Sequence, residues 1–165
     1  MYYLRRRKAA PKAKAADGGL PVFGPPRRKT ADRARARLVR QADEAFSRYI
    51  RLRDSSPDGT FRCISCGRTL PTDEADCGHY HSRRHMGTRY DEDNAHAECR
   101  ACNRFRSDHL IGYARNLERK IGKERMDALS ARAARACRLD RQDLLELARL
   151  YHAKARQLEL EGRRL

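Results

Sequence analysis

The sequence lacks long apolar runs. No stretch of about 18 apolar residues occurs in the 165 residues, so no segment is expected to span a membrane. The N-terminal stretch also lacks the run of roughly 7–15 apolar residues that marks a secretory signal, so we expect a cytoplasmic protein. No apolar face accompanies the basic N-terminal residues, which argues against attachment to a membrane surface.

Acidic residues are also scarce. The chain has 38 Lys and Arg against 22 Asp and Glu, a net charge of +16. Residues 1–40 hold most of this excess, with 13 basic and 2 acidic side chains. A strongly basic arm on a milder body is typical of proteins that bind nucleic acid, and Arg27, Arg28 and Lys29 are candidate contacts. A solvated, solubilising tail is the alternative.

The middle of the chain has too few apolar residues for a large core. Residues 61–105 are mostly polar, and a bound metal is the usual substitute in so small a unit. Two Cys-x-x-Cys pairs, Cys63/Cys66 and Cys99/Cys102, can supply four thiolates to one tetrahedral Zn²⁺. A closed four-cysteine shell leaves no position for water, so we predict a structural zinc. Free or disulfide-paired cysteines and a thioredoxin-like redox pair are the alternatives.

The apolar pattern divides the chain into four parts. Residues 1–29, rich in Gly, Pro, Ala and Lys, are expected to form a disordered basic arm. Residues 30–54 contain no Gly or Pro and are predicted to form a helix. Residues 55–107 form the zinc-bound core, with short strands at the first cysteine pair and the second pair running into a helix. Residues 108–165 are predicted to be helical, beginning with a helix capped by Ser107. The predicted fold class is α+β, a small zinc-stabilised centre flanked by α-helices.

The last predicted helix carries a long apolar stripe. Its members are Leu144, Leu147, Tyr151, Ala155 and Leu158. This stripe could pair two chains in a homodimer, or it could pack on the apolar face of residues 110–121 within one chain.

A second group of polar residues lies inside the segment that the zinc closes. The stretch DCGHYHSRRH (residues 76–85) is followed by TRYDEDNAHAEC (88–99) and by the dipeptide CN, which contains the last zinc cysteine. The order His, Asn, Cys-x-x-Cys-Asn between paired zinc cysteines resembles HNH or ββα-metal endonucleases. It resembles the phage NinG (Rap) recombination-protein family more closely. YIRLRD (49–54) and CISCG (63–67) extend this resemblance to roughly residues 42–124.

The resemblance implies a β-hairpin and a helix around one catalytic divalent ion, Mg²⁺ or Mn²⁺, beside the structural zinc. It implies an endonuclease that hydrolyses phosphodiester bonds in branched or structured DNA, such as Holliday junctions. The setting would be phage recombination inside the bacterial host cell. In this comparison His79 matches the general base, Asn94 matches the asparagine that orients the loop, and Asn103 matches a metal ligand.

The chain departs from the HNH pattern at one position. Many HNH motifs place a metal-binding Asp or His directly before the base, where this chain has Gly78. Either Asp76 reaches the metal instead, or His81 or His96 replaces the missing ligand. His81 is also the rival base, since in a β conformation it shares one face with His79. Two adjacent imidazoles would suit a softer ion such as Mn²⁺ or Zn²⁺.

Arginines of the same segment are the candidate phosphate contacts. Arg83 and Arg84 are placed to meet DNA phosphate, and Arg89 is a further candidate. His85 and His109 are expected to be ordinary surface residues. The rival hypothesis is a non-catalytic zinc module that binds DNA or RNA as a recombination accessory protein. An RNA-directed nuclease is a third.

Overall fold

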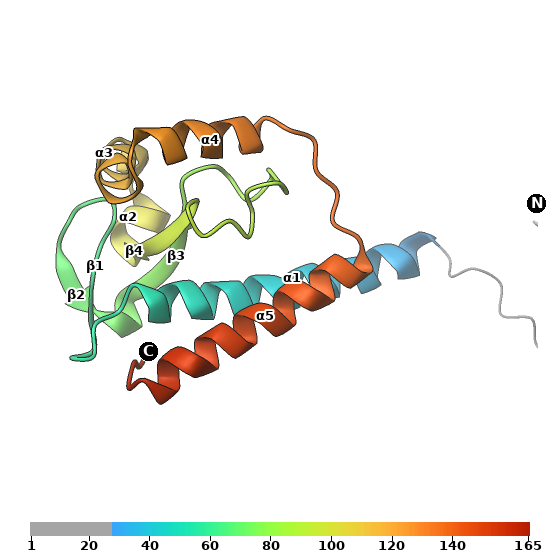
Figure 1. The fold of residues 1–165 in the computed structure, drawn as a ribbon, viewed down its shortest axis with the longest axis horizontal. Coiled ribbons are helices and arrows are strands. Elements are labelled where there is room, and N and C mark those ends of the chain that lie inside the picture. The colour runs from blue at the N-terminus through green and yellow to red at the C-terminus, as the bar shows by residue number, and fades with distance from the viewer. Residues whose placement is uncertain (1–27) are drawn as a thin grey trace, which may run out of the picture.

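The structure, a computed structural model, describes residues 28–165. The predicted disordered arm up to Arg27 lies outside these residues, and so do the side chains of Arg28 and Lys29. Within the described part, five α-helices, a short 3-10 helix and two two-stranded sheets confirm a mixed α+β fold. In chain order the elements are α1 (Arg28–Arg53), β1 (Thr60–Arg62), β2 (Thr69–Pro71), η1 (Thr72–Glu74), β3 (Ala75–His79), β4 (Ala95–Cys99), α2 (Arg100–Phe105), α3 (His109–Ile121), α4 (Lys123–Ala133) and α5 (Arg141–Leu160) (Figure 1).

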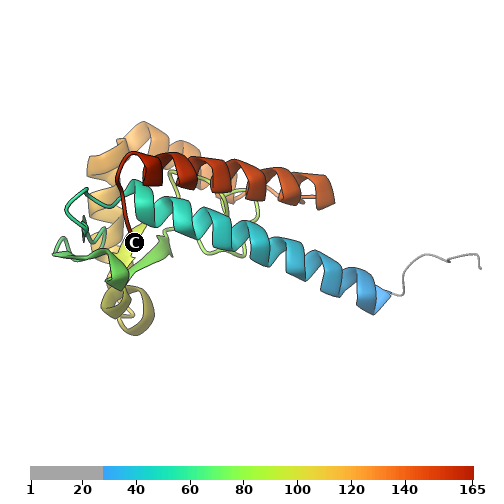
Figure 2. The same ribbon diagram turned by 90° about the horizontal axis from the view of Figure 1, so that it is seen from below.

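Helices α1 and α5 lie side by side although they stand at opposite ends of the described chain (Figures 1 and 2). Leu144, Tyr151 and Ala155 of the predicted stripe are buried in one cluster with Ala42 and Phe46 of α1. Helix α1 covers the stripe, so the prediction that it packs on residues 110–121 is wrong. The possible homodimer stays a prediction. No helix among residues 28–165 is long and apolar enough to cross a membrane.

Each sheet is an antiparallel pair of short strands. β1 and β2 form the hairpin that carries the first cysteine pair, and β3 pairs with β4 from Ala75↔Cys99 to His79↔Ala95. Helix α2 follows β4 directly, so two antiparallel strands and a helix come together around the second cysteine pair. A small cluster of buried apolar and cysteine side chains joins the two sheets.

Two local predictions are wrong. Residues Ala95–Cys99, expected as part of a knuckle running into a helix, form strand β4. A strand with this alternation of apolar and polar residues is expected to expose its polar face, but all five residues are buried, His96 and Glu98 included. The N-cap of α3 is Asp108 rather than Ser107, and no side chain caps this helix. The Asp108 carboxylate instead pairs with Arg106, with 3.1 Å between Oδ2 and Nη2.

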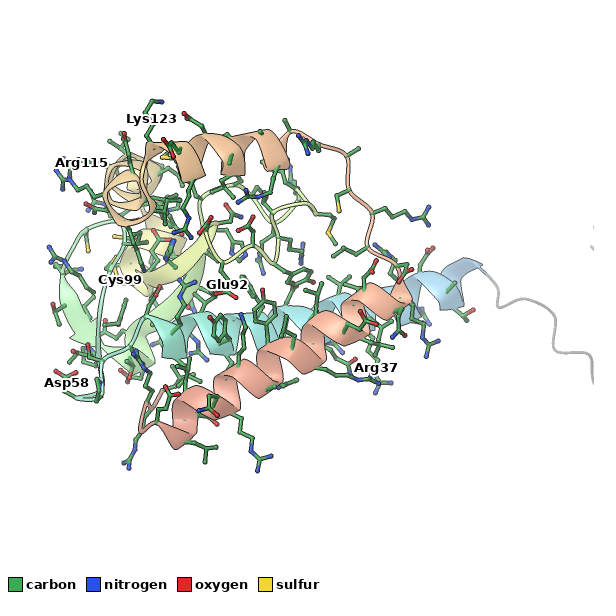
Figure 3. All side chains as sticks on the ribbon, in the orientation of Figure 1. Arg37, Asp58, Glu92, Cys99, Arg115 and Lys123 are labelled. Atoms are coloured by element: carbon green, nitrogen blue, oxygen red, sulfur yellow. The ribbon has the colours of Figure 1, made fainter. Side chains whose placement is uncertain are left out.

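The loop between β3 and β4 is anchored on the helical pair. Glu92, labelled in Figure 3, accepts a hydrogen bond from the Tyr49 hydroxyl at 2.7 Å and pairs with Lys154 Nζ at 2.5 Å. Tyr49 belongs to α1 and Lys154 to α5, so one carboxylate ties the loop to both helices. Both helices therefore hold the loop just before it enters β4.

Candidate functional site

The four knuckle cysteines converge on one point. The Sγ atoms of Cys63, Cys66, Cys99 and Cys102 all lie within 4.8 Å of one another. Four thiolates about 2.3 Å from a central Zn²⁺ would have similar mutual spacings, so this donor set fits a tetrahedral zinc ion. Among residues 28–165, no other group of three or more His, Cys, Asp or Glu side chains is close enough to hold a metal.

Backbone geometry supports the cysteine cluster. Gly67 has a φ of +72°, a conformation that L side chains rarely adopt, and its N–H donates to the Cys63 carbonyl at 2.9 Å. This closes the first knuckle. The Cys99 N–H donates to Cys63 Sγ at 3.3 Å, which ties the two knuckles together. The cluster thereby fixes the point at which β4 passes into α2.

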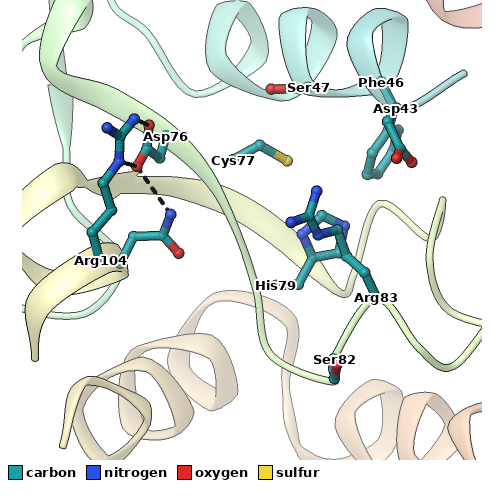
Figure 4. A pocket seen from close by; sticks show the side chains of 10 residues that line it. Asp43, Phe46, Ser47, Asp76, Cys77, His79, Ser82, Arg83 and Arg104 are labelled. Carbon is teal, nitrogen blue, oxygen red and sulfur yellow. Dashed lines mark hydrogen bonds and ion pairs between the residues drawn. The ribbon is translucent and has the colours of Figure 1, made fainter. Parts of the chain in front are cut away.

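A pocket of about 520 Å³ lies between α1, β3 and α2, beside the cysteine cluster. Ten residues line it, namely Asp43, Phe46, Ser47, Asp76, Cys77, His79, Ser82, Arg83, Asn103 and Arg104 (Figure 4). Four of these were predicted site residues: His79, Asp76, Asn103 and Arg83. The pocket therefore brings together a candidate base, two candidate oxygen ligands and a candidate phosphate contact.

The His79 imidazole is oriented by the backbone. Its Nε2 lies 3.0 Å from the Arg89 carbonyl oxygen, and a carbonyl can only accept, so Nε2 carries the hydrogen. Nδ1 is then the nitrogen that can take up a proton. Burial lowers the pKa of His79 below its ordinary value, and the nearby Arg83 guanidinium acts in the same direction. His79 is therefore a neutral imidazole at neutral pH.

The Asp76 carboxylate is held by two residues of α2. Asn103 Nδ2 donates to Oδ2 at 3.0 Å, and Arg104 binds both oxygens at 2.7 Å (dashed lines in Figure 4). Burial alone would raise the pKa of Asp76, but the hydrogen bonds from Arg104 and Asn103 lower it below its ordinary value. Asp76 is therefore ionised in the pocket, next to an amide whose carbonyl oxygen has no partner among the described residues.

Asn94 is fully buried and holds the loop after β3. Its Oδ1 accepts from the His81 N–H at 2.7 Å, and its Nδ2 donates to the His81 and Thr88 carbonyls at 3.0 and 2.9 Å. These three bonds place Asn94 inside the loop rather than in the pocket. The placement suits an orienting residue that takes no part in chemistry.

His81 does not line the pocket. Strand β3 ends at His79, and His81 Nε2 lies 3.3 Å from Ser130 Oγ on α4. The expectation that His79 and His81 share one face is wrong, because the strand geometry it assumed stops before His81 is reached.

His96 also lies outside the pocket. Its Nδ1 is 2.8 Å from Arg53 Nη2 and 3.0 Å from Lys120 Nζ, so this nitrogen accepts from two cations. Burial lowers the pKa of His96, which agrees with a neutral ring. The structure therefore does not bring His96 together with Asp76 and Asn103.

The three candidate phosphate contacts differ in their surroundings. Arg83 is exposed and lines the pocket, and Arg84 is exposed beside it. Arg89 binds both oxygens of Asp43 on α1 and donates to the Arg83 carbonyl at 2.6 Å. Arg89 therefore fixes the loop against α1. The N–H groups that it would need to bind a phosphate are already used in these contacts.

Close packing explains the glycine that departs from the HNH pattern. A Cβ added at Gly78 would lie 2.8 Å from the Glu98 Cβ and would overlap Glu98 Oε2. Glu98 is fully buried, and its Oε1 accepts from Ser65 Oγ at 2.5 Å and lies 2.7 Å from His109 Nδ1. The prediction that His109 is an ordinary surface residue is therefore wrong.

Replacing Gly78 with Ala is expected to lower the free energy of unfolding by about 1–3 kcal/mol, because the new methyl group displaces a buried carboxylate. Urea denaturation would measure this. In a Gly78→Ala/Glu98→Gly variant both the carboxylate and the Cβ that the new methyl group would meet are gone, so the pair should cost less than the sum of the two single changes. Strictly additive losses would contradict the packing explanation.

One side of the pocket is formed by α1, which was not predicted from the sequence. Asp43, Phe46 and Ser47 come from α1, about 30 residues before the His79 strand, and no motif links them to it. Arg104 was also missed, although its place directly after Asn103 on a helix was a usable signal. Its ion pair with Asp76 is the feature that most changes the predicted site.

Comparison with known proteins identifies the family. The family model described as "Bacteriophage Lambda NinG protein" matches residues 6–161. The chain belongs to the NinG family. Two similar NinG-family relatives are "Protein ninG" of Escherichia phage 933W, 36% identical over 105 residues, and "Protein ninG" of Salmonella phage P22, 35% identical over 105 residues. Each alignment covers 63% of this chain and 50% and 49% of the two relatives, so the chain spans about half the length of the curated NinG proteins it matches. No solved structure matches it.

Proposed function

We propose that this NinG-family protein is an HNH-like, metal-dependent endonuclease that cuts branched or structured DNA during phage recombination in the host cell. One observation carries the proposal. The pocket beside the cysteine cluster gathers a backbone-oriented neutral imidazole, an ionised carboxylate, an amide oxygen and an exposed arginine. These are the groups that hydrolysis of a phosphodiester requires.

In the proposed reaction His79 acts as the general base. Its Nδ1 takes a proton from the water that attacks phosphorus, while the Arg89 carbonyl holds Nε2–H and keeps the ring in place. Arg83 at the pocket edge binds the phosphate oxygens. The Asn94 hydrogen bonds keep the loop that carries Arg83 in register with β3.

Asp76 and Asn103 would hold the catalytic ion. Both offer oxygen atoms, which a hard ion such as Mg²⁺ or Mn²⁺ prefers. Bound there, the ion would stabilise charge on the phosphate and on the leaving oxygen. Arg104 is exposed and pairs with Asp76, so this guanidinium would have to release or share the carboxylate for Asp76 to hold an ion.

A substrate panel tests the function. Zinc-loaded protein would be incubated with a four-way DNA junction, the matching linear duplex and the same junction built in RNA, each with Mg²⁺ or Mn²⁺. We expect cleavage of the DNA junction in preference to the duplex. Cleavage of the RNA alone would make the protein an RNA-directed nuclease. Cleavage of none of the three would contradict the proposal.

The cleavage rate is expected to rise with pH, with its midpoint below about pH 6.5. Only neutral His79 can accept a proton, and burial lowers its pKa below that of an exposed histidine, which is about 6.5. A single-turnover pH–rate profile measures the midpoint. A midpoint well above pH 7 would exclude His79 as the base.

Deleting residues 1–27 is expected to weaken binding to all DNA sequences and to flatten the salt dependence of the dissociation constant. The slope should fall by about 0.9 for each phosphate of duplex DNA that the arm no longer neutralises. Fluorescence anisotropy at several salt concentrations gives the slope. A scrambled arm of the same composition should bind like the natural one, and an unchanged slope after deletion would show that the arm does not meet phosphate.

A non-catalytic zinc module that binds nucleic acid is the second candidate function. It is favoured by the Asp76–Arg104 pair, because that carboxylate already has a cationic partner in the pocket. Junction binding without cleavage in either Mg²⁺ or Mn²⁺ would establish it.

A further inference from the structure

A second cavity, lined mainly by basic residues, is separate from the His79 pocket. It encloses about 680 Å³ between the end of α1, the first cysteine knuckle, α3 and the C-terminal residues. It shares no lining residue with the His79 pocket. Its charged members are Arg53, Asp54, Arg62, Arg119, Lys120 and Arg163. We call this the Arg62/Arg119 cavity.

The single carboxylate of the cavity is already neutralised. Asp54 accepts from Arg53 Nε at 2.9 Å, from Lys120 Nζ at 3.1 Å and from the Ala97 N–H at 2.8 Å. These donors are part of the folded structure and leave no negative charge to oppose a bound anion. Five cationic side chains against one paired carboxylate therefore give the cavity a net positive charge.

Three guanidinium groups of the cavity have no carboxylate partner among residues 28–165. Arg62 and Arg119 are exposed, and Arg119 makes only a 3.4 Å bond to Asn116 Oδ1. Arg163 is fixed by its Nη1, which donates to the carbonyls of residues 52, 53 and 55. Its remaining N–H groups stay available. Unpaired guanidinium groups that converge on a cavity are suited to a phosphate group, because each can bind two of its oxygens.

We propose that the Arg62/Arg119 cavity binds a backbone phosphate of DNA at a position separate from the His79 pocket. Its partner is a second DNA segment, such as another arm of a branched molecule. This inference rests on the proposed function for the choice of DNA as the phosphate source. It adds a second contact point, through which one chain holds two segments of its substrate.

Matched double variants test the cavity. Arg62→Ala/Arg119→Ala removes two cavity charges, and Arg149→Ala/Arg156→Ala removes two exposed arginines of α5 that have no ion pair within residues 28–165. Binding of a four-way junction to zinc-loaded protein is measured by fluorescence anisotropy over a salt series, with no other divalent ion added. We expect the cavity variant to bind roughly tenfold more weakly, with a slope lower by about 1 to 2, and the α5 variant to bind like the natural protein.

The outcomes separate the alternatives. Equal weakening by both variants would mean that only total charge matters, and no weakening by the cavity variant would also overturn the proposal. A further measurement uses inorganic phosphate as the ligand, at constant ionic strength. If it binds the natural protein but not the cavity variant, while both bind the junction equally, the cavity takes free phosphate and not DNA. The binding assay does not depend on cleavage. A protein that binds the junction but does not cut it would therefore contradict the proposed nuclease function without contradicting the proposal for the cavity.

Discussion

Replacing His79 with Ala is expected to lower the single-turnover rate of junction cleavage by roughly 10²–10⁴-fold, the usual contribution of a general base. The substrate should bind as before, because the His79 ring contacts Phe46 and a backbone carbonyl, and the arginines at the pocket edge are untouched. Gel-based cleavage and anisotropy binding on the same preparation separate the two effects.

Two neighbouring histidines supply the controls for His79. His85→Ala removes an exposed imidazole of the same loop whose Nδ1 lies 3.1 Å from the Ala133 carbonyl, and the cleavage rate should stay within a few fold of the natural one. His81→Ala tests the rival base directly. Full activity in His79→Ala together with loss of activity in His81→Ala would transfer the role to His81.

Replacing Cys63 with Ser is expected to unfold the centre of the protein, and not merely to lower the rate of cleavage. A structural zinc contributes about 10–16 kcal/mol of apparent binding free energy, as much as the whole stability of a typical domain. Cys63 is buried within the cluster, and its Sγ also accepts the Cys99 N–H. Zinc content by mass spectrometry and secondary structure by circular dichroism would both fall.

Cys137 provides the matched control for the cysteine cluster. It is exposed and lies outside the four-cysteine group, so Cys137→Ser should keep full zinc content and an unchanged unfolding temperature. A Cys63→Ser variant that stays folded without zinc would show that the centre does not depend on the metal.

The cysteine cluster also positions the pocket. Cys99 ends β4, Cys102 lies in α2, and Asn103 and Arg104 follow on the same helix. Fixing these cysteines therefore fixes the two α2 side chains that hold Asp76. Loss of zinc should for this reason abolish cleavage together with the fold.

Features that depend on local spacing could be predicted from the sequence. Two Cys-x-x-Cys pairs predicted the cluster because knuckle spacing presents both thiolates of a pair to one ion, and the four Sγ atoms do converge. His79, Asp76 and Asn103 could be placed together because the cluster closes the segment between them. The predicted helix over residues 30–54 agrees with α1 to within two residues, since an uninterrupted stripe without Gly or Pro is a strong helix signal.

Features that depend on packing between distant segments could not be predicted. The α5 stripe was compatible with several partners, and only the three-dimensional structure shows that α1 covers it. His81 and His96 were indistinguishable from His79 by residue type, yet one turns toward α4 and the other is held by Arg53 and Lys120. The collision that requires Gly78 involves Glu98, a residue 20 positions away.

The most direct test of the account is the dependence of junction cleavage on a divalent ion other than zinc. Zinc-loaded protein would be mixed with a labelled four-way DNA junction under single-turnover conditions, first without added metal and then with Mg²⁺ or Mn²⁺. We predict no cleavage in the first case and cleavage in the second, with the zinc content unchanged throughout. Cleavage that needs no added ion, or no cleavage under either condition, would contradict the account.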